Sequence, residues 1–275
     1  MEFKNTIVSN FQGAFRGLRN PLESWEKSDS VFGIDATFDC DKDWDIADLY
    51  CKRDNIDFES KDFFETEEKY ATWLRNNGVL RTNDGYTECI EYAFIGPNDL
   101  DLAHRMIKAG SSDRKFLRQI LVSVDITAPL YWYKEFDTYK VGTVANSTST
   151  MHKLSSTPIT EECFELSDFK NNLILYDKIE QYDLPSFSTQ DMMKTIISYC
   201  ETLRKKFLET KDQNYWKELI RWLPNGWLQT RTITLNYEIL RNQYFQRKNH
   251  KLVEWHKYCE WIESLPYAKD LILYE

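Results

Sequence analysis

The sequence contains no run of about 20 apolar residues, the length that a helix needs to cross a membrane. The segment Met1 to Asn10 also lacks the positive region followed by an apolar stretch that is typical of a signal peptide. We therefore expect a soluble, cytoplasmic protein with no membrane segment and no secretion signal.

Metal-binding patterns are missing as well. The six cysteines are scattered, without a CxxC pair or zinc-finger spacing, and are interpreted as reduced thiols of a cytosolic protein. Among the four histidines, His250 and His256 do not stand at the i, i+4 spacing that places two ligands on one helix face. The sequence predicts no metal site.

Common catalytic motifs are also absent. The chain has no GxGxxG or GxxxxGK[ST] phosphate loop, no GxSxG elbow and no HExxH. A nucleophilic Cys–His pair stays open, because such pairs form in space rather than in sequence.

The charge balance restricts the class of ligand. A net charge of −9 and a pI of about 5.2 disfavour non-specific binding to a nucleic-acid backbone. A mononucleotide remains compatible with this charge, because it needs only a local cluster of Arg and Lys side chains.

What the sequence does contain is a mixture of helix and strand patterns. Apolar periodicity and turn residues predict strands at 86–94, 120–126 and 228–235. They predict helices at 11–18, 97–107 (closed by Gly110), 130–141, 191–209, 211–223, 236–247 and 251–265. We predict an α+β fold, with a mixed or antiparallel sheet flanked by helices and a helical C-terminal region.

Two of these helices have a defined apolar face. In the helix at 191–209 the predicted core face is Met192, Ile196, Tyr199, Leu203 and Phe207. In the helix at 251–265 it is Leu252, Trp255, Cys259 and Ile262.

Three segments read as irregular. Residues 38–68 are acidic and polar, which favours a surface insertion around 38–70, with a short helix at 66–75. Residues 142–152 form a loop rich in hydroxyl and amide donors, and 176–190 form a polar linker. We expect residues 1–275 to form a single domain that carries the acidic insertion.

The most informative pattern lies in residues 219–254. Arg221 precedes Leu223-Pro224, and Thr234-Leu235-Asn236 opens a helix. Asn242 follows six residues later, Arg247 five residues after that, and Glu254 lies in the next helix. Eleven residues is close to three helical turns, so Asn236 and Arg247 share one face.

These residue types suit a nucleotide site. An arginine can bond a carbonyl or phosphate in a bidentate way, and an asparagine amide at a helix start can hold a ligand's polar edge. The alternative is that Asn236 is an ordinary N-cap and that Arg221 and Arg247 form surface ion pairs.

The pattern resembles the flavin-dependent thymidylate synthases (ThyX). The resemblance implies that Arg221 and Arg247 contact a deoxyuridylate-type nucleotide and that Asn236 and Asn242 contact FAD. A second segment, 139–152, is similar to the family's signature, in which an arginine-histidine-arginine cluster is followed by Ser, Asn, Ser, Arg and a terminal aromatic residue. There Asn146 corresponds to a flavin-binding asparagine and Ser149 to the second serine.

The resemblance implies catalytic roles for Ser149 and Arg247 and nucleotide contacts from Arg221, Arg247, Ser149 and Lys140. It also implies FAD as cofactor, NADPH and methylenetetrahydrofolate as co-substrates, and a homotetramer. The reaction would be reductive alkylation of the pyrimidine at C5, without a protein nucleophile.

This segment also departs from the family. Tyr139-Lys140-Val141 replaces the arginine-histidine-arginine cluster, and Met151 replaces a later arginine. Two hypotheses therefore stay open: a divergent enzyme, or a non-catalytic or repurposed relative that serves as a nucleotide sensor or as a binding protein for a macromolecule.

Overall fold

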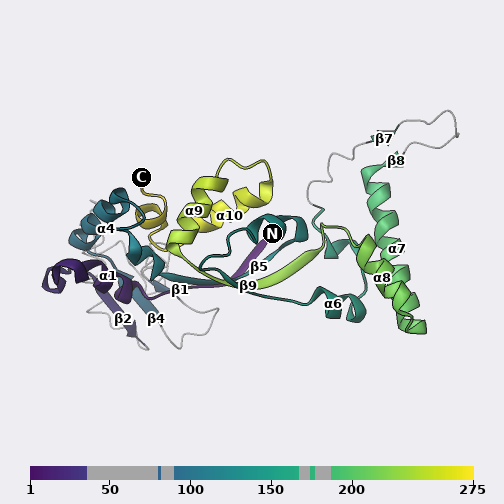
Figure 1. Ribbon diagram of the computed structural model, residues 1–275, viewed down its shortest axis with the longest axis horizontal. Coiled ribbons are helices and arrows are strands. Elements are labelled where there is room, and N and C mark those ends of the chain that lie inside the picture. The colour runs from purple at the N-terminus through teal and green to yellow at the C-terminus, as the bar shows by residue number, and fades with distance from the viewer. Residues whose placement is uncertain (36–79, 82–89, 167–173, 177–186) are drawn as a thin grey trace, which may run out of the picture. The chain divides into compact units, whose positions relative to one another are not determined.

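A computed structural model describes residues 1–35, 80–81, 90–166, 174–176 and 187–275 (Figure 1). The expected acidic insertion around 38–70 and the helix expected at 66–75 lie outside the described residues. The described chain divides into two compact units. The first unit consists of Met1–Phe3, Asp125–Lys140 and Ala145–Thr232, and the second consists of Lys4–Val124, Val141–Val144 and Ile233–Glu275. The expectation of a single domain stays a prediction.

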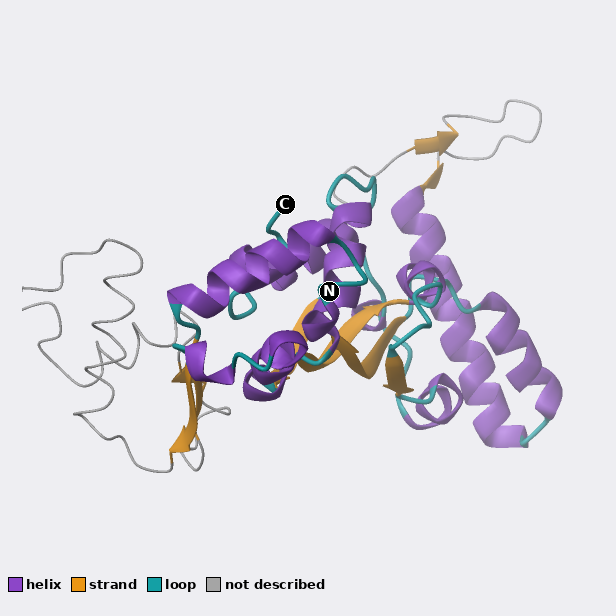
Figure 2. Ribbon diagram, turned by 60° about the vertical axis from the view of Figure 1, so that its left-hand side comes forward, coloured by secondary structure: helices purple, strands orange, loops and turns teal. Residues whose placement is uncertain are grey.

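Strands form three sheets in the described residues. A four-stranded sheet has the order β1-β5-β9-β6, from β1 (Glu2–Ser9), β5 (Leu121–Pro129), β9 (Leu228–Asn236) and β6 (Val144–Ser147). A three-stranded antiparallel sheet joins β2 (Val31–Asp35), β4 (Ile90–Phe94) and β3 (Leu80–Arg81). A short antiparallel pair joins β7 (Ile174–Tyr176) to β8 (Phe187–Ser188). With helices beside the strands (Figure 2), the predicted α+β class is confirmed.

The predicted central strands are confirmed. Along β5, Val122, Val124, Ile126 and Ala128 are fully buried while the residues between them are not. This alternation is the period of two that a strand imposes on its side chains. Strand β9 covers the predicted 228–235 and leads directly into the next helix.

The helices of the second unit agree with the sequence patterns. Helix α1 (Phe11–Arg19) ends at Asn20-Pro21, and α4 (Pro97–Ala109) ends at Gly110, whose φ of 116° suits only glycine. Helices α9 (Tyr237–Arg247) and α10 (Val253–Glu263) also lie as predicted. In α10, Trp255, Cys259 and Ile262 are buried, whereas Leu252 precedes the helix and is 37% exposed.

Two predictions around residues 130–152 are wrong. Helix α5 (Leu130–Phe136) ends five residues before the predicted end at 141. The backbone N–H of the C-cap residue Asp137 donates to the carbonyl oxygens of Tyr133 and Glu135. Residues 142–152 are not an irregular loop. Strand β6 lies beside β9, and α6 (Thr150–Ser156) begins where the Ser149 hydroxyl accepts a bond from the His152 amide.

The polar linker expected at 176–190 also contains regular structure at its ends. Strand β7 reaches Tyr176, and β8 ends at Ser188. Helix α7 (Thr189–Thr210) starts with a capping box between Ser188 and Asp191.

The first unit has its own apolar core. Helix α7 packs on α8 (Gln213–Trp222), and both contribute to it (Figure 1). The buried members of the cluster are Leu154, Ile159, Phe164, Ile197, Cys200, Leu203, Leu219 and Trp227.

The predicted core face of α7 is correct only in part. Leu203 is buried and Ile196 packs against the core as predicted, but Ile197 and Cys200 are also buried, while Met192 and Tyr199 are 40% and 45% exposed. One residue turns a helix face by about 100°. The partners on α8 and α6 decide which side is covered, and Tyr199 instead meets Trp222 edge-on, with ring centroids 5.9 Å apart.

No helix within the described ranges combines the length and the apolar character of a transmembrane segment.

Candidate functional site

The start of helix α9 is built around Asn236. Strand β9 delivers this residue in an extended conformation, and its Oδ1 accepts a hydrogen bond from the Ile239 amide at 3.1 Å. Asn236 is therefore an N-cap, as the alternative interpretation holds. Capping uses only the carboxamide oxygen, so its Nδ2 remains a donor that a ligand can use.

Gly142 brings the two informative segments of the sequence together at this helix start. Its φ is 73°, and a Cβ atom there would lie 2.8 Å from Ile239 Cδ1 and 3.6 Å from Asn236 Nδ2. Only glycine combines this backbone conformation with so close an approach. Next to it, the Thr143 hydroxyl is buried without a hydrogen-bond partner among the described residues.

Helix α9 carries the other predicted residues of the second unit. Arg247 is half-buried, with its guanidinium 4.8 Å from the centroid of the Trp255 ring. Arg247 is the last residue of α9, so it lies about 15 Å along the axis from Tyr237, the first helical residue after Asn236. Asn242 is exposed and lies about 140° around the helix from Arg247. A ligand that contacts Asn236 and Arg247 must therefore be long.

Glu238 stabilises the N-terminal turn of α9. Its role was not predicted from the sequence. It is buried and accepts two bonds from Arg114, at 2.8 Å from Nε and 3.1 Å from Nη2. A carboxylate in the first turn also interacts favourably with the helix dipole. The pair connects α9 to the chain before β5 and holds the N-terminus of α9 in place.

The remaining predicted residues belong to the first unit. Ser149 caps α6, with its hydroxyl accepting a bond from the His152 amide at 3.3 Å, which leaves the hydroxyl proton to donate. Asn146 on β6 and Lys140 after α5 are both exposed. Arg221 is exposed on α8 and pairs with Glu218 one turn away.

Two further side chains, Gln229 next to Ser149 and Arg231 next to Gln229, were not predicted from the sequence. Gln229 donates from Nε2 to the Thr148 carbonyl at 2.9 Å and to Thr150 Oγ1 at 3.3 Å. Arg231 donates from Nε to Gln229 Oε1 at 2.9 Å. The alternation in LQTRTITL could have shown that Gln229 and Arg231 share one face of the strand.

Arg231 is held by two further groups. Its Nη1 lies 2.7 Å from Asp137 Oδ1, and its Cζ lies 3.8 Å from the centroid of the Tyr133 ring. Burial is the main cause that raises the pKa of Tyr133 above its usual range, so the phenol stays neutral and donates to the Ile126 carbonyl at 2.5 Å. The guanidinium is thus paired and stacked within this unit.

The buried thiols are poor nucleophiles. Burial raises the pKa of both Cys200 and Cys259 to about 11, so little thiolate exists at neutral pH. Both are free cysteines, as is Cys163. Within the described residues, no group of three or more His, Cys, Asp and Glu side chains could hold a metal ion.

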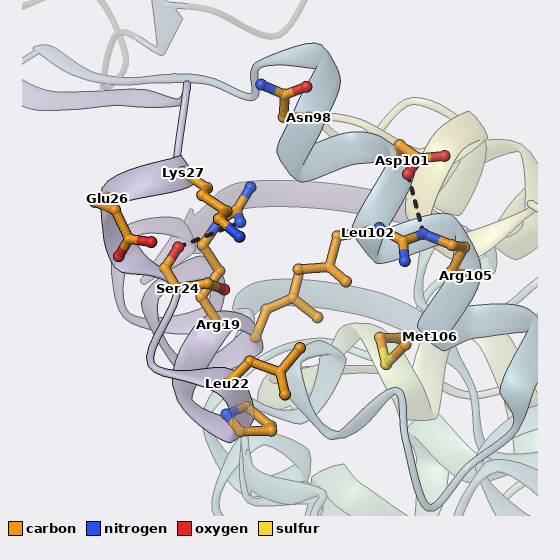
Figure 3. A pocket seen from close by; sticks show the side chains of 12 residues that line it. Arg19, Leu22, Ser24, Glu26, Lys27, Asn98, Asp101, Leu102, Arg105 and Met106 are labelled. Carbon is orange, nitrogen blue, oxygen red and sulfur yellow. Dashed lines mark hydrogen bonds and ion pairs between the residues drawn. The ribbon is translucent and has the colours of Figure 1, made fainter.

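A cavity of about 710 Å³ lies in the second unit between α1 and α4 (Figure 3). It contains none of the predicted site residues. Figure 3 shows its arginines already engaged: Arg19 points to the Ser24 carbonyl and Arg105 pairs with Asp101. Arg19 also pairs with the buried Asp99. Both arginines of the cavity are therefore already paired, and Lys27 is its remaining basic lining residue.

No sequence-family model matches the chain, and no curated protein sequence matches it. Solved structures do. The chain aligns with the flavin-dependent thymidylate synthase ThyX from Helicobacter pylori complexed with FAD and dUMP, with a TM-score of 0.54 and 14% identity. This alignment covers 99% of this chain and 98% of that one.

A second structure of ThyX from Helicobacter pylori with FAD and dUMP gives a TM-score of 0.52 at 15% identity, covering 99% of this chain and 97% of that one. A UMP/dUMP methylase, PolB from Streptomyces cacaoi bound with 5-Br UMP, aligns more weakly, with a TM-score of 0.46 at 12% identity over 64% of this chain and 83% of that one. The chain therefore has the fold of the flavin-dependent thymidylate synthases, and the predicted resemblance is confirmed at the level of the fold.

Proposed function

We propose that this chain is a divergent thymidylate synthase-like enzyme that binds FAD and a deoxyuridine monophosphate-type nucleotide and alkylates the pyrimidine at C5. The observation that supports this most directly lies at the start of α9. There Gly142, from the segment 139–152, packs on Asn236 and Ile239, from the segment 219–254. This contact occurs in a fold that aligns over 99% of its length with an enzyme complexed with FAD and dUMP.

The residues at this helix start suit a flavin. Asn236 Nδ2 and the buried Thr143 hydroxyl are donors for the carbonyl and phosphate oxygens of FAD. Asn242 and Asn146 are the further proposed FAD contacts. When bound, the flavin supplies the redox chemistry, with NADPH as the proposed reductant and methylenetetrahydrofolate as the proposed carbon donor.

The nucleotide contacts are assigned to cationic and hydroxyl groups. Arg247 offers a bidentate fork that already stacks on Trp255 and so is partly preorganised. Ser149 has a hydroxyl proton to donate to a substrate oxygen, because its capping bond uses an oxygen lone pair. Lys140 and Arg221 complete the proposed set. Arg247 and Ser149 are the residues to which we assign catalytic roles, as groups that orient the substrate and stabilise charge.

The same proposal includes a single domain over residues 1–275 and a homotetramer in the cytoplasm. Size-exclusion chromatography with light scattering measures the assembly, and a monomeric mass would contradict the tetramer.

A non-catalytic relative is the second candidate, and two observations favour it. Tyr139-Lys140-Val141 stands where the family has its basic cluster. Arg221, one of the two proposed nucleotide arginines, is exposed and paired with Glu218. A protein of this kind would keep a nucleotide pocket, or act as a binding protein for a macromolecule, without the reaction.

The deciding experiment is an absorption spectrum of the purified protein, recorded after incubation with FAD and dUMP and subsequent desalting. The enzyme proposal expects flavin bands that stay with the protein. It also expects dUMP at 100 times its Kd to raise the Tm by about 5–10 °C. A turnover assay with Arg247→Ala as control follows. A colourless protein with an unchanged Tm contradicts the enzyme and favours the second candidate.

A further inference from the structure

Gln229 holds the chain on both sides of Ser149. Its Nε2 donates to the carbonyl oxygen of Thr148 and to the hydroxyl of Thr150, at 2.9 and 3.3 Å. The Thr148 amide also donates to the Thr230 carbonyl at 2.9 Å. Ser149 thus lies between two residues that one carboxamide ties to strand β9.

Arg231 decides which way this carboxamide faces. A guanidinium has only donors, so Arg231 Nε can pair only with the oxygen of Gln229, at 2.9 Å. The amide nitrogen is then directed toward Thr148 and Thr150. A flipped carboxamide would put a donor against Arg231 and an acceptor against the Thr148 carbonyl, so both contacts would be lost.

Arg231 is itself held rigidly. Its side chain is only 14% exposed, its Nη1 pairs with Asp137 and its Cζ stacks on the Tyr133 ring at 3.8 Å. Tyr133 is buried and anchored by its bond to the Ile126 carbonyl. Because the charge of Arg231 is already compensated by Asp137, this arginine suits a supporting role better than direct ligand binding.

We infer that Gln229 and Arg231 are positioning residues for Ser149: Arg231 orients the Gln229 carboxamide, and Gln229 fixes the Thr148–Thr150 backbone that presents the Ser149 hydroxyl. The inference rests on the proposed function, in which Ser149 binds the nucleotide. Neither side chain needs to touch the ligand.

The test variant is Gln229→Glu. It has the same size and keeps an acceptor for Arg231, but it replaces the donor that faces Thr148 and Thr150. The matched control is Thr127→Val, which removes the 2.7 Å hydroxyl bond between Thr127 and Thr230. Thr230 projects from the opposite face of β9 to Gln229 and Arg231, since side chains alternate along a strand.

The first readout needs no ligand. Hydrogen exchange is measured by mass spectrometry on peptides that cover Thr148 to Ser156. Gln229→Glu and Arg231→Met are expected to speed exchange in these peptides about tenfold. Thr127→Val should change it less. Arg231→Lys should also change it less, because it keeps a positive charge beside Asp137. Unchanged exchange in Gln229→Glu overturns the inference, whether or not the protein binds a nucleotide.

The second readout is a double-mutant cycle on dUMP affinity, measured by calorimetry. If Gln229 acts through Ser149, Gln229→Glu weakens binding about tenfold in the wild-type background. It then has little further effect in Ser149→Ala. If the fold losses of dUMP affinity in Gln229→Glu and Ser149→Ala simply multiply in the double variant, the inference is overturned. Absence of dUMP binding by the wild type contradicts the proposed function instead, and the exchange experiment still decides the positioning role.

Discussion

Gly142 lies directly against Ile239: a Cβ atom at position 142 would come within 2.8 Å of Ile239 Cδ1. This approach joins the chain after α5 to the first turn of α9, within the second unit. It also places Gly142 beside the carboxamide of Asn236. The helix start is therefore shaped by backbone packing as well as by its cap.

Gly142→Ala is expected to destabilise the protein by about 1–3 kcal/mol, from the positive φ and the clash with Ile239. Adding Ile239→Val removes Cδ1, the atom that clashes with the new Cβ. The double variant should therefore regain the stability lost to the clash but not the stability lost to the positive φ. Thermal unfolding of both variants measures this. A Tm of Gly142→Ala equal to that of the wild type would contradict the close packing.

Substitution of Asn236 separates its capping role from its proposed role in flavin binding. Asn236→Ala should cost about 1 kcal/mol through loss of the cap. Asn236→Asp keeps an acceptor for the Ile239 amide and suits the helix dipole, but it lacks the amide donor. We expect Asn236→Asp to keep the wild-type Tm and to lose FAD from the desalted protein. Full retention of FAD by this variant would limit Asn236 to capping.

The two proposed nucleotide arginines have different surroundings and should differ in effect. Arg247→Gln removes a half-buried guanidinium that stacks on Trp255, and should weaken dUMP binding at least tenfold, or about 1.4 kcal/mol. Arg221→Gln serves as a comparison, since Arg221 is exposed and paired with Glu218. We expect a smaller loss there, and calorimetry with dUMP measures both. Equal affinities of Arg247→Gln and the wild type would remove Arg247 from the site.

Glu201 should make the stability of the first unit depend on pH. It accepts two bonds from Arg204, both at 2.7 Å, and one from the Ile159 amide at 2.8 Å. The bonds from Arg204 are the main cause that lowers the pKa of Glu201 in the folded protein. Its contribution is therefore complete above the unfolded pKa of about 4.3 and is lost as the pH falls through the lower folded value.

Glu201→Gln tests this dependence. The variant should lose about 1–3 kcal/mol at pH 7, because Arg204 is then left without its carboxylate. The difference in Tm between variant and wild type should shrink as the pH is lowered from 5 to 3. A difference that stays constant over this range would contradict the role of the ionised carboxylate.

Local sequence patterns were sufficient for much of the fold. The alternation at 120–126 and 228–235, and the stop signals at Asn20-Pro21 and Gly110, predicted elements that the structure contains. These features depend on backbone preferences and side-chain periodicity within a few residues, which the sequence carries directly. The same holds for Asn236 and Arg247, because one caps the N-terminus of α9 and the other is its last residue.

Other features depended on neighbours distant in the chain. The buried face of α7 was predicted only in part, because contacts with α6 and α8 decide which of its apolar side chains are covered. The apolar side chains of α7 spread around more of the helix than these contacts cover, so the sequence alone does not show which of them are buried. Strand β6 was missed because its four residues are all exposed and polar in part. Its place beside β9 comes from pairing with that strand, not from an apolar pattern.

In the candidate site, too, the sequence predicted some residues, while the contacts of others depend on the fold. Residue types and spacing singled out Asn236, Asn242, Arg247 and Ser149, because each belongs to a short continuous motif. The hydrogen bonds of Gln229 with Thr148 and Thr150 join residues 81 and 79 positions apart, and only the folded chain brings them within hydrogen-bond distance. Hydrogen bonds act over about 3 Å, so which partners meet is decided by tertiary packing and not by the order of residues.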